Sequence, residues 1–156
     1  MTEEAKHSAA VLLIDDDSTV RETVAELLRQ KGYAVAAFAD AESGLEQMTK
    51  DVFQIAVCDY HLPNASGIAF AARARTISPE MPVIMISGVA PPDDALDAVL
   101  AGASAFLSKP FLPEELLWLL ARAIRLGPQK LAPIIAPASI VDAGSATPLG
   151  ETPPAV

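Results

Sequence analysis

Two apolar runs of the chain each end in aspartate. Asp15–Asp17 directly follow Val11–Ile14, and Asp59 directly follows Gln54–Cys58. Adjacent carboxylates repel one another: at ~4 Å and an effective dielectric of ~20, each pair costs about 4 kcal/mol. A chain that gathers such charges needs a positive partner, so these residues predict a cation site.

A hydroxyl and an ammonium group stand in comparable places. Ser87 ends the apolar run PVIMIS, and Lys109 directly follows the run SAFLS. The carboxyl ends of parallel strands meet at one edge of a sheet, where α/β proteins place their ligands. We therefore expect both groups beside the carboxylates of Asp15, Asp16 and Asp59.

A hard divalent cation fits this set of groups. Mg²⁺ prefers oxygen ligands, retains several waters and needs only a few protein carboxylates beside a phosphate oxygen. The ion and the lysine together balance the charge of the carboxylates Asp15, Asp16 and Asp59. One carboxylate can also act as a nucleophile and form an acyl phosphate. The set predicts a magnesium-dependent phosphoryl-transfer site, with Asp17 as a solvated residue at a helix start.

Five short apolar runs supply the elements that position these groups. Their hydrophobicity is continuous, which is typical of parallel strands covered on both faces. The runs are Val11–Ile14, Ala34–Phe38, Gln54–Cys58, Pro82–Ser87 and Ser104–Ser108. We predict an α/β fold with a doubly wound, five-stranded parallel sheet. In the flavodoxin-like (βα)5 strand order 2-1-3-4-5, strands one and three are neighbours, so their ends converge.

Segments of helical period separate the strands. The first begins near Thr19, which with Glu22 has the spacing of a capping box. The others are expected near residues 41–50, 68–77, 93–102 and 113–126. Pro113 and the glutamates after it suit the positive end of the last helix.

Composition limits the class of protein. The 156 residues carry a formal net charge of −9, which argues against direct nucleic-acid binding. Cys58 is the only cysteine, so no intrachain disulfide forms, and we expect a small buried strand residue there. No apolar run reaches the ~20 residues that span a bilayer, and the polar N-terminus is unlike a signal peptide. We expect a cytoplasmic protein without a membrane partner.

Four motifs in this order, LLIDDDSTVR, VCDYHLPNASG, PVIMISG and AGASAFLSKPF, resemble the receiver domains of two-component response regulators. The resemblance covers roughly residues 9 to 126. Within the family, the chain is similar to single-domain, chemotaxis-type receivers. It implies that Asp59 accepts a phosphoryl group from a sensor histidine kinase or a histidine phosphotransfer protein. The protein would then be a phosphorelay switch and not an enzyme.

The resemblance also implies a ligand set for Mg²⁺. Asp15, Asp16, Asp59 and the backbone carbonyl of His61 would arrange the ion, with Asp15 acting through water. The imidazole of His61 is the poorer ligand because Mg²⁺ prefers oxygen.

Three further residues take phosphoryl-contacting or switch positions in the resemblance. Lys109 would contact the phosphoryl oxygens, Ser87 would hydrogen-bond one of them, and Phe106 would be the switch aromatic. A cis peptide bond is implied between Lys109 and Pro110, where only an X-Pro bond adopts cis at low cost.

The chain divides by composition into three parts. Residues 1–8 form an N-terminal extension, residues 9–127 the receiver domain, and residues 128–156 a Pro/Ala-rich tail. The tail holds six of the 13 prolines and three charged residues, so we expect it to be disordered.

The output surface is expected on the last helix. Residues 116–121 contain no polar side chain, and a helix that is apolar nearly all round is normally buried nearly all round. The outer side, with Leu117 or Trp118, would meet a second copy, a kinase domain, another protein target or the tail at residues 131–141. The alternative is a generous core with one or two exposed leucines.

Two other functions remain open. Asp15–Thr19 also fit the pattern D-x-D-x-T, which resembles the nucleophile motif of haloacid-dehalogenase-type phosphatases. Asp15 would then be the nucleophile and Asp17 the acid–base residue, and Asp59 would have no role. The second alternative is a receiver-like binding module that no longer switches.

Overall fold

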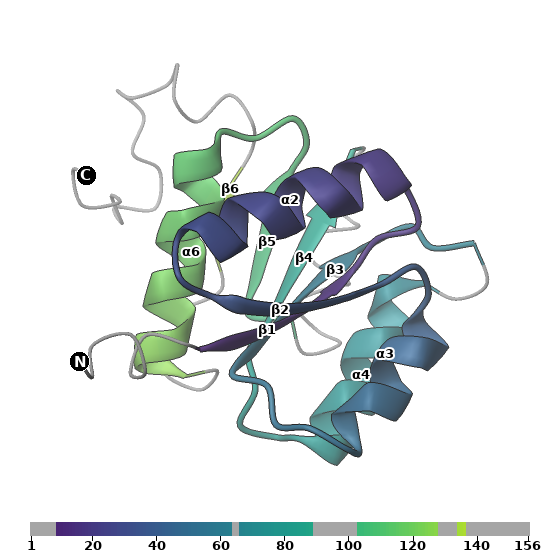
Figure 1. The fold of residues 1–156 in the computed structure, drawn as a ribbon. Coiled ribbons are helices and arrows are strands. Elements are labelled where there is room, and N and C mark those ends of the chain that lie inside the picture. The colour runs from purple at the N-terminus through teal and green to yellow at the C-terminus, as the bar shows by residue number, and fades with distance from the viewer. Residues whose placement is uncertain (1–8, 64–65, 89–102, 128–133, 137–156) are drawn as a thin grey trace.

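Ten elements make up the described part of the chain. The computed structural model describes residues 9–63, 66–88, 103–127 and 134–136 (Figure 1). The strands are β1 (Ala10–Ile14), β2 (Ala34–Phe38), β3 (Ile55–Asp59), β4 (Val83–Ser87), β5 (Ala105–Ser108) and β6 (Ile134–Ala136). The helices are α2 (Ser18–Gln30), α3 (Ala41–Met48), α4 (Gly67–Ile77) and α6 (Pro113–Leu126). The helix predicted at 93–102 lies outside the described residues.

All strands pair in parallel in one sheet. The order is β2-β1-β3-β4-β5-β6, so the predicted order 2-1-3-4-5 is confirmed and a sixth strand extends it. Ile14 pairs with Cys58, and Asp59 pairs with Ile86, which aligns the carboxyl ends of β1, β3 and β4. The doubly wound α/β prediction therefore holds.

The sixth strand differs from the prediction for the tail. Ile134–Ala136 lie within the segment expected to be disordered, yet they pair in parallel with Ala105–Leu107 of β5. The reason is tertiary: α6 returns the chain to the end of the sheet where β5 begins, and the edge of β5 is there to pair with. The remaining tail, at 128–133 and 137–156, and residues 1–8 of the extension lie outside the described residues.

The sheet separates two cores. Alternate strand residues face opposite sides, so Leu12 and Ala56 belong to one core while Val11 and Ile55 belong to the other. Helices α3 and α4 cover the first core, and α2 and α6 cover the second (Figure 1). This packing explains why the strands are apolar throughout.

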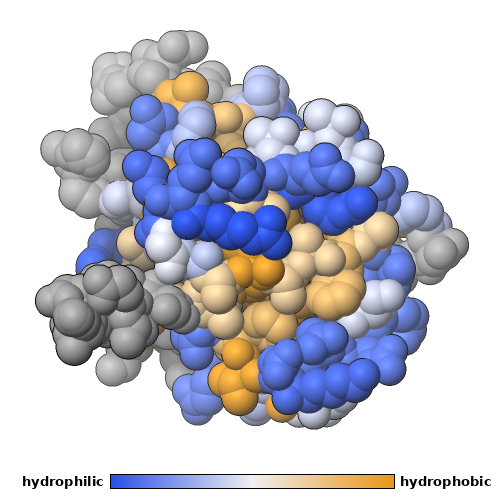
Figure 2. Space-filling model, in the orientation of Figure 1, coloured by the Kyte–Doolittle hydropathy of each residue, from blue (hydrophilic) through white to orange (hydrophobic). Residues whose placement is uncertain are grey.

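Strand β2 forms one edge of the sheet and is only partly covered. Its residues are exposed or half-buried, in contrast to the fully buried β3 and β4. Figure 2 shows apolar surface in the middle of this face, between two polar bands.

Candidate functional site

Asp15 directly follows β1 and is fixed by backbone contacts. It is 3 % exposed, and its N–H donates to the Phe38 carbonyl (3.1 Å). Its Oδ1 accepts from the Asp17 N–H (2.9 Å), and its carbonyl accepts from the Arg21 guanidinium (2.7 Å). One carboxylate oxygen, Oδ2, therefore remains for the site.

Asp16 and Asp17 have different roles. Both are exposed, but Asp16 adds its carboxylate to the acidic cluster, whereas Asp17 caps α2. The Asp17 Oδ1 accepts from the N–H groups of Thr19 (2.9 Å) and Val20 (3.2 Å). The prediction that Thr19 is the capping residue was wrong, because Asp17 reaches the free N–H groups from two residues earlier.

Asp59 ends β3 and is held at its own backbone. Its Oδ1 accepts from the His61 N–H (3.1 Å). The following residue, Tyr60, donates its N–H to Ile86 (2.7 Å) and accepts from the Gly67 N–H (2.8 Å). The strand end thus remains joined to both β4 and α4.

Gly67 allows this close approach of α4 to β3. A Cβ at this position would lie 2.7 Å from the Asp59 carbonyl oxygen, 2.9 Å from the Tyr60 Cα and 2.8 Å from the Met85 Sδ. Two of these atoms are backbone and cannot move aside. The glycine is therefore required by the position of the Asp59 strand end.

The predicted carboxylates converge. Ligand atoms of Asp15, Asp16 and Asp59 all lie within 4.8 Å of one another. The Lys109 Nζ lies 3.3 Å from the Asp15 Oδ2 and 3.6 Å from the Asp59 Oδ2. Three negative charges thus face one ammonium, which leaves a net negative site.

The electrostatics of Asp59 reflect this imbalance. Burial is the largest cause that raises the pKa of its carboxyl, and the charges of Asp15 and Asp16 raise it further. Lys109 and the His61 N–H act in the opposite direction without cancelling the burial. A further cation would relieve this cost.

The donor set fits Mg²⁺. The oxygens of Asp15, Asp16 and Asp59 are hard ligands, and the exposed Asp16 leaves one side open to the waters that this ion retains. Cys58, although adjacent, is no ligand: burial and then the charges of Asp59 and Asp15 raise the pKa of its thiol well above the usual value. Cys58 is buried as predicted.

The strand ends of β4 and β5 bring the other predicted groups to the same edge. Ser87 is buried at the end of β4, and its carbonyl accepts from the Lys109 N–H (2.7 Å). The peptide bond between Lys109 and Pro110 is cis, as the resemblance implied. Ser87 and Lys109 are therefore tied together by backbone on the side of the site that faces Asp59.

Phe106 lies inside the molecule. It is fully buried in the middle of β5, and its ring meets the Tyr60 ring edge-on at 5.8 Å between centroids. The Tyr60 ring in turn meets the exposed His61 imidazole at 4.8 Å.

Leu117 and Trp118 of α6 are half-buried. Both pack against the core that α2 and α6 share. The Arg122 guanidinium lies 5.4 Å from the centre of the Trp118 ring. The structure therefore places these side chains at the margin of the core, between the two sequence interpretations.

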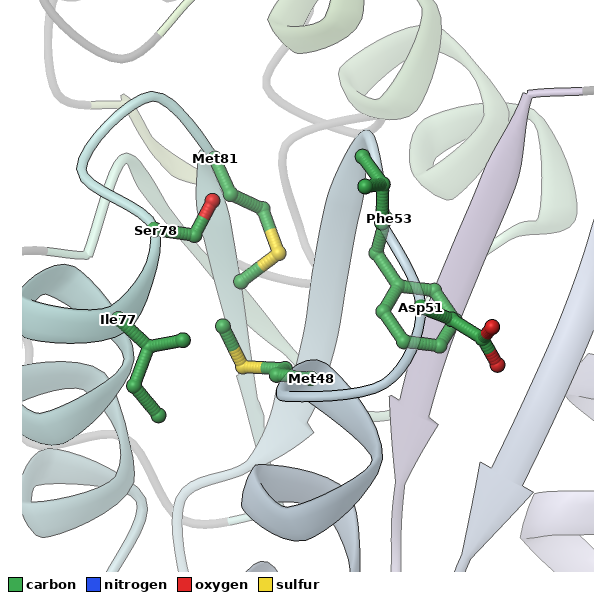
Figure 3. A pocket seen from close by; sticks show the side chains of 7 residues that line it. Met48, Asp51, Phe53, Ile77, Ser78 and Met81 are labelled. Atoms are coloured by element: carbon green, nitrogen blue, oxygen red, sulfur yellow. The ribbon is translucent and has the colours of Figure 1, made fainter.

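A pocket of about 140 Å³ lies at the opposite end of the sheet (Figure 3). Met48, Phe53, Ile77 and Met81 supply most of its lining, and they stand at helix ends or just before β3 and β4. Carboxyl ends of parallel strands all point the other way, so this pocket is separate from the acidic cluster.

Sequence reasoning missed two residues of the site. Arg21 holds the Asp15 carbonyl, and Gly67 makes room for the Asp59 strand end. Arg21 gave one signal, its place in the first turn of the helix that follows Asp15. Gly67 gave another, as a glycine at a helix start instead of a helix end.

Comparison with known proteins agrees with this geometry. Residues 11–121 match the family described as the response regulator receiver domain. The response regulator protein TodT of Pseudomonas putida is 31 % identical over 123 residues, which are 79 % of this chain and 54 % of TodT. FleR of Pseudomonas aeruginosa is 32 % identical over 74 % of this chain and 24 % of its own length. The chain thus spans about half of TodT and about a quarter of FleR.

Solved structures share the fold. A CheY-like receiver domain from Methanospirillum hungatei superposes with a TM-score of 0.73 at 29 % identity, over 76 % of this chain and 94 % of that one. The chemotaxis protein CheY4 of Vibrio cholerae gives 0.71 at 31 % identity, over 74 % and 98 %. None of the helices in the described ranges has the length and hydrophobicity that crossing a bilayer requires. The chain belongs to the receiver domains of two-component response regulators.

Proposed function

We propose that this receiver is a phosphorylation switch in which Asp59 is the phosphoryl acceptor. The observation that carries the proposal is the convergence of Asp59 with Asp15 and Asp16 within 4.8 Å, opposite the Lys109 ammonium. The donor is the phosphohistidine of a sensor histidine kinase or a histidine phosphotransfer protein.

The reaction places Asp59 in line with the donor. A carboxylate oxygen attacks phosphorus, the bond from phosphorus to the histidine nitrogen breaks, and the imidazole leaves with that electron pair. The His61 N–H holds Oδ1, and Lys109 faces Oδ2, so the carboxylate has a fixed orientation. Lys109 would then pair with the phosphoryl oxygens, and the Ser87 hydroxyl would bond one of them.

Mg²⁺ would be held by Asp15, Asp16, Asp59 and the His61 carbonyl, and it would neutralise charge on the transferring group. Asp15 fits an outer, water-mediated role because Lys109 and the Asp17 N–H already engage its two carboxylate oxygens. The resulting switch would act on a downstream protein through contacts of its surface.

A phosphatase with Asp15 as nucleophile is less well supported. Its Oδ1 accepts from the Asp17 N–H and its Oδ2 from Lys109. Asp17, the acid–base residue of that scheme, uses its carboxylate to cap α2. The relatives are signalling proteins. A receiver-like module that only binds would keep the fold and remain unlabelled in the experiment below.

The test is covalent labelling of the whole chain. With Mg²⁺ and acetyl phosphate, the protein should gain one acid-stable, base-labile phosphoryl group. Borohydride trapping and peptide mass spectrometry should locate it at Asp59. Asp59→Asn should remove the label, and the surface control Asp51→Asn should retain it.

Label at Asp15 would favour the phosphatase and contradict the switch. Absence of any label in the presence of Mg²⁺ would favour the binding module. EDTA should abolish labelling, because Asp59 would then lack the counter-charge that the acidic cluster requires.

A further inference from the structure

Strand β6 covers an edge that has no protection of its own. β5, Ala105–Ser108, contains neither a charged residue nor a proline, which are the features that usually keep an open strand edge from pairing with other chains. β6 pairs with its first three residues, Ala105 with Ile134 through Leu107 with Ala136. The sequence places Pro133 before β6 and Pro137 after it.

The flanking prolines suit a terminal strand. Proline lacks an N–H and cannot extend a ladder, so it is confined to edges and strand ends. β6 therefore closes the β5 edge without itself offering a long new one. Because it is only three residues long, its ladder supplies few backbone hydrogen bonds, each of modest net strength.

The covered strand is also the one that leads into the site. Lys109 directly follows β5, and its N–H donates to the Ser87 carbonyl of β4. In the order β3-β4-β5-β6, Asp59 lies on one side of β5 and β6 lies on the other. A movement of the β5 end toward Asp59 is thus a movement away from β6.

Phe106 lies at the centre of the part of β5 that pairs with β6. Its ring is fully enclosed against Tyr60 in the present structure. Its register partner in β6 is Ile135. A shift of β5 thus alters the β6 ladder at the same residue.

We propose that Ile134–Ala136 is a displaceable cover of the β5 edge, and that phosphorylation of Asp59 releases it. This rests on the proposed function. A phosphoryl group on Asp59 draws Lys109, which now pairs with Asp15 and Asp59, and the end of β5 moves with it because Lys109 directly follows Ser108. The short β6 ladder loses its geometry before the longer β4–β5 ladder does.

Linkage gives the proposal a reciprocal consequence. If the phosphorylated form disfavours β6, then loss of β6 must favour the phosphorylated form by the same factor. The receiver without an attached β6 should therefore bind a phosphoryl analogue more tightly.

The experiment uses the full chain with two consecutive substitutions, Ile134→Pro and Ile135→Pro. Successive N–H groups of a strand point to opposite sides, so one of the two prolines must remove an N–H that faces β5. The matched control is Ile134→Val with Ile135→Val, which retains β-branched strand formers. Circular dichroism checks that each variant is folded.

The probe is beryllofluoride with Mg²⁺, a phosphoryl analogue, and its affinity is measured by titration. The proline pair should bind it about fivefold more tightly than the valine pair. In hydrogen exchange, those amides of Ala105–Leu107 that face β6 should exchange about tenfold faster in the proline pair, while those that face β4 remain protected. Beryllofluoride should likewise speed the exchange of the β6-facing amides in the wild-type chain.

Equal or weaker binding by the proline pair would overturn the proposal, and so would β6 protection that beryllofluoride leaves unchanged. If the proline pair is unfolded, wild-type exchange with and without beryllofluoride decides. Wild-type protein that neither binds beryllofluoride nor takes label at Asp59 would refute the proposed function and the coupling together. Binding and labelling without release of β6 would refute the coupling alone.

Discussion

Asp59 carries its charge at a cost to the fold. Burial raises the pKa of this carboxyl above its ordinary value of 3.8, so the folded chain holds the proton more tightly than the unfolded chain does. The protonated carboxyl therefore favours the folded state at acid pH. That contribution is lost as the pH rises from the unfolded pKa through the folded pKa.

Asp59→Asn should consequently stabilise the protein at neutral pH when EDTA removes divalent ions. We expect a rise in Tm of about 3 °C at pH 7, which shrinks toward pH 3, where the wild-type carboxyl is also neutral. Calorimetric scans at the two pH values measure this difference. Saturating Mg²⁺ should reverse the order, because the ion stabilises only the chain with the full ligand set. A lower Tm for the variant at pH 7 in EDTA would show that Lys109 outweighs burial.

The residue types at strand ends predicted much of the site from the sequence. Asp15, Asp16 and Asp59 follow apolar runs, and parallel strands bring such residues together. Arg21 could not be found in this way, because it acts through the Asp15 backbone and not through a shared strand end. The net direction of the Asp59 pKa shift also depends on burial, which only the folded arrangement fixes.

At the scale of elements, the contact between α4 and β3 positions the acceptor. Gly67→Ala would put a methyl group within 3 Å of the Asp59 carbonyl oxygen and the Tyr60 Cα. The backbone must then separate, and we expect a loss of about 2 kcal/mol in the free energy of unfolding. Mg²⁺ affinity should fall as well, because the Asp59 carboxylate moves with its strand end.

Gly88→Ala is the matched control. A Cβ there meets nothing within 4 Å, and the position follows Ser87 at the same edge of the sheet. Denaturant unfolding and Mg²⁺ titration of both variants would distinguish them. Equal losses would mean that glycine at this edge matters for flexibility and not for the approach of α4 to β3.

The element boundaries show where local sequence rules hold and where they fail. The apolar runs predicted β1 to β5 closely, because the sheet lies between two layers of helices and most of these strands are buried. β6 was missed because three residues between prolines carry no pattern of their own, and their pairing depends on the edge that α6 brings them to. Tertiary context, not propensity, decides such a strand.

At the scale of the whole molecule, α6 presents the proposed partner surface. Leu117 and Trp118 are half-buried, and Arg122 stacks on the Trp118 ring. Tryptophan is favoured as an interface anchor, since it buries much area at low entropic cost. We expect Trp118→Arg to abolish self-association of the phosphorylated chain, or binding of its protein target, while Asp59 labelling persists.

Sedimentation of the beryllofluoride-bound protein measures its self-association directly. Arg122→Lys is the control, because it retains the positive charge beside the intact tryptophan. If Trp118→Arg is unfolded by circular dichroism, the ring belongs to the core and the surface proposal is wrong. A folded variant with unchanged association would place the interface elsewhere.

Because the sheet separates the two cores, each core can accumulate substitutions separately. No buried side chain of the α3–α4 core is shared with the α2–α6 core among the described residues. A substitution that changes volume on one side is therefore compensated by neighbours on that same side, and the two sets of residues can diverge at separate rates. The site at the strand ends touches both, through strands common to each core. A substitution in either core can therefore reach the site through the strands that carry it.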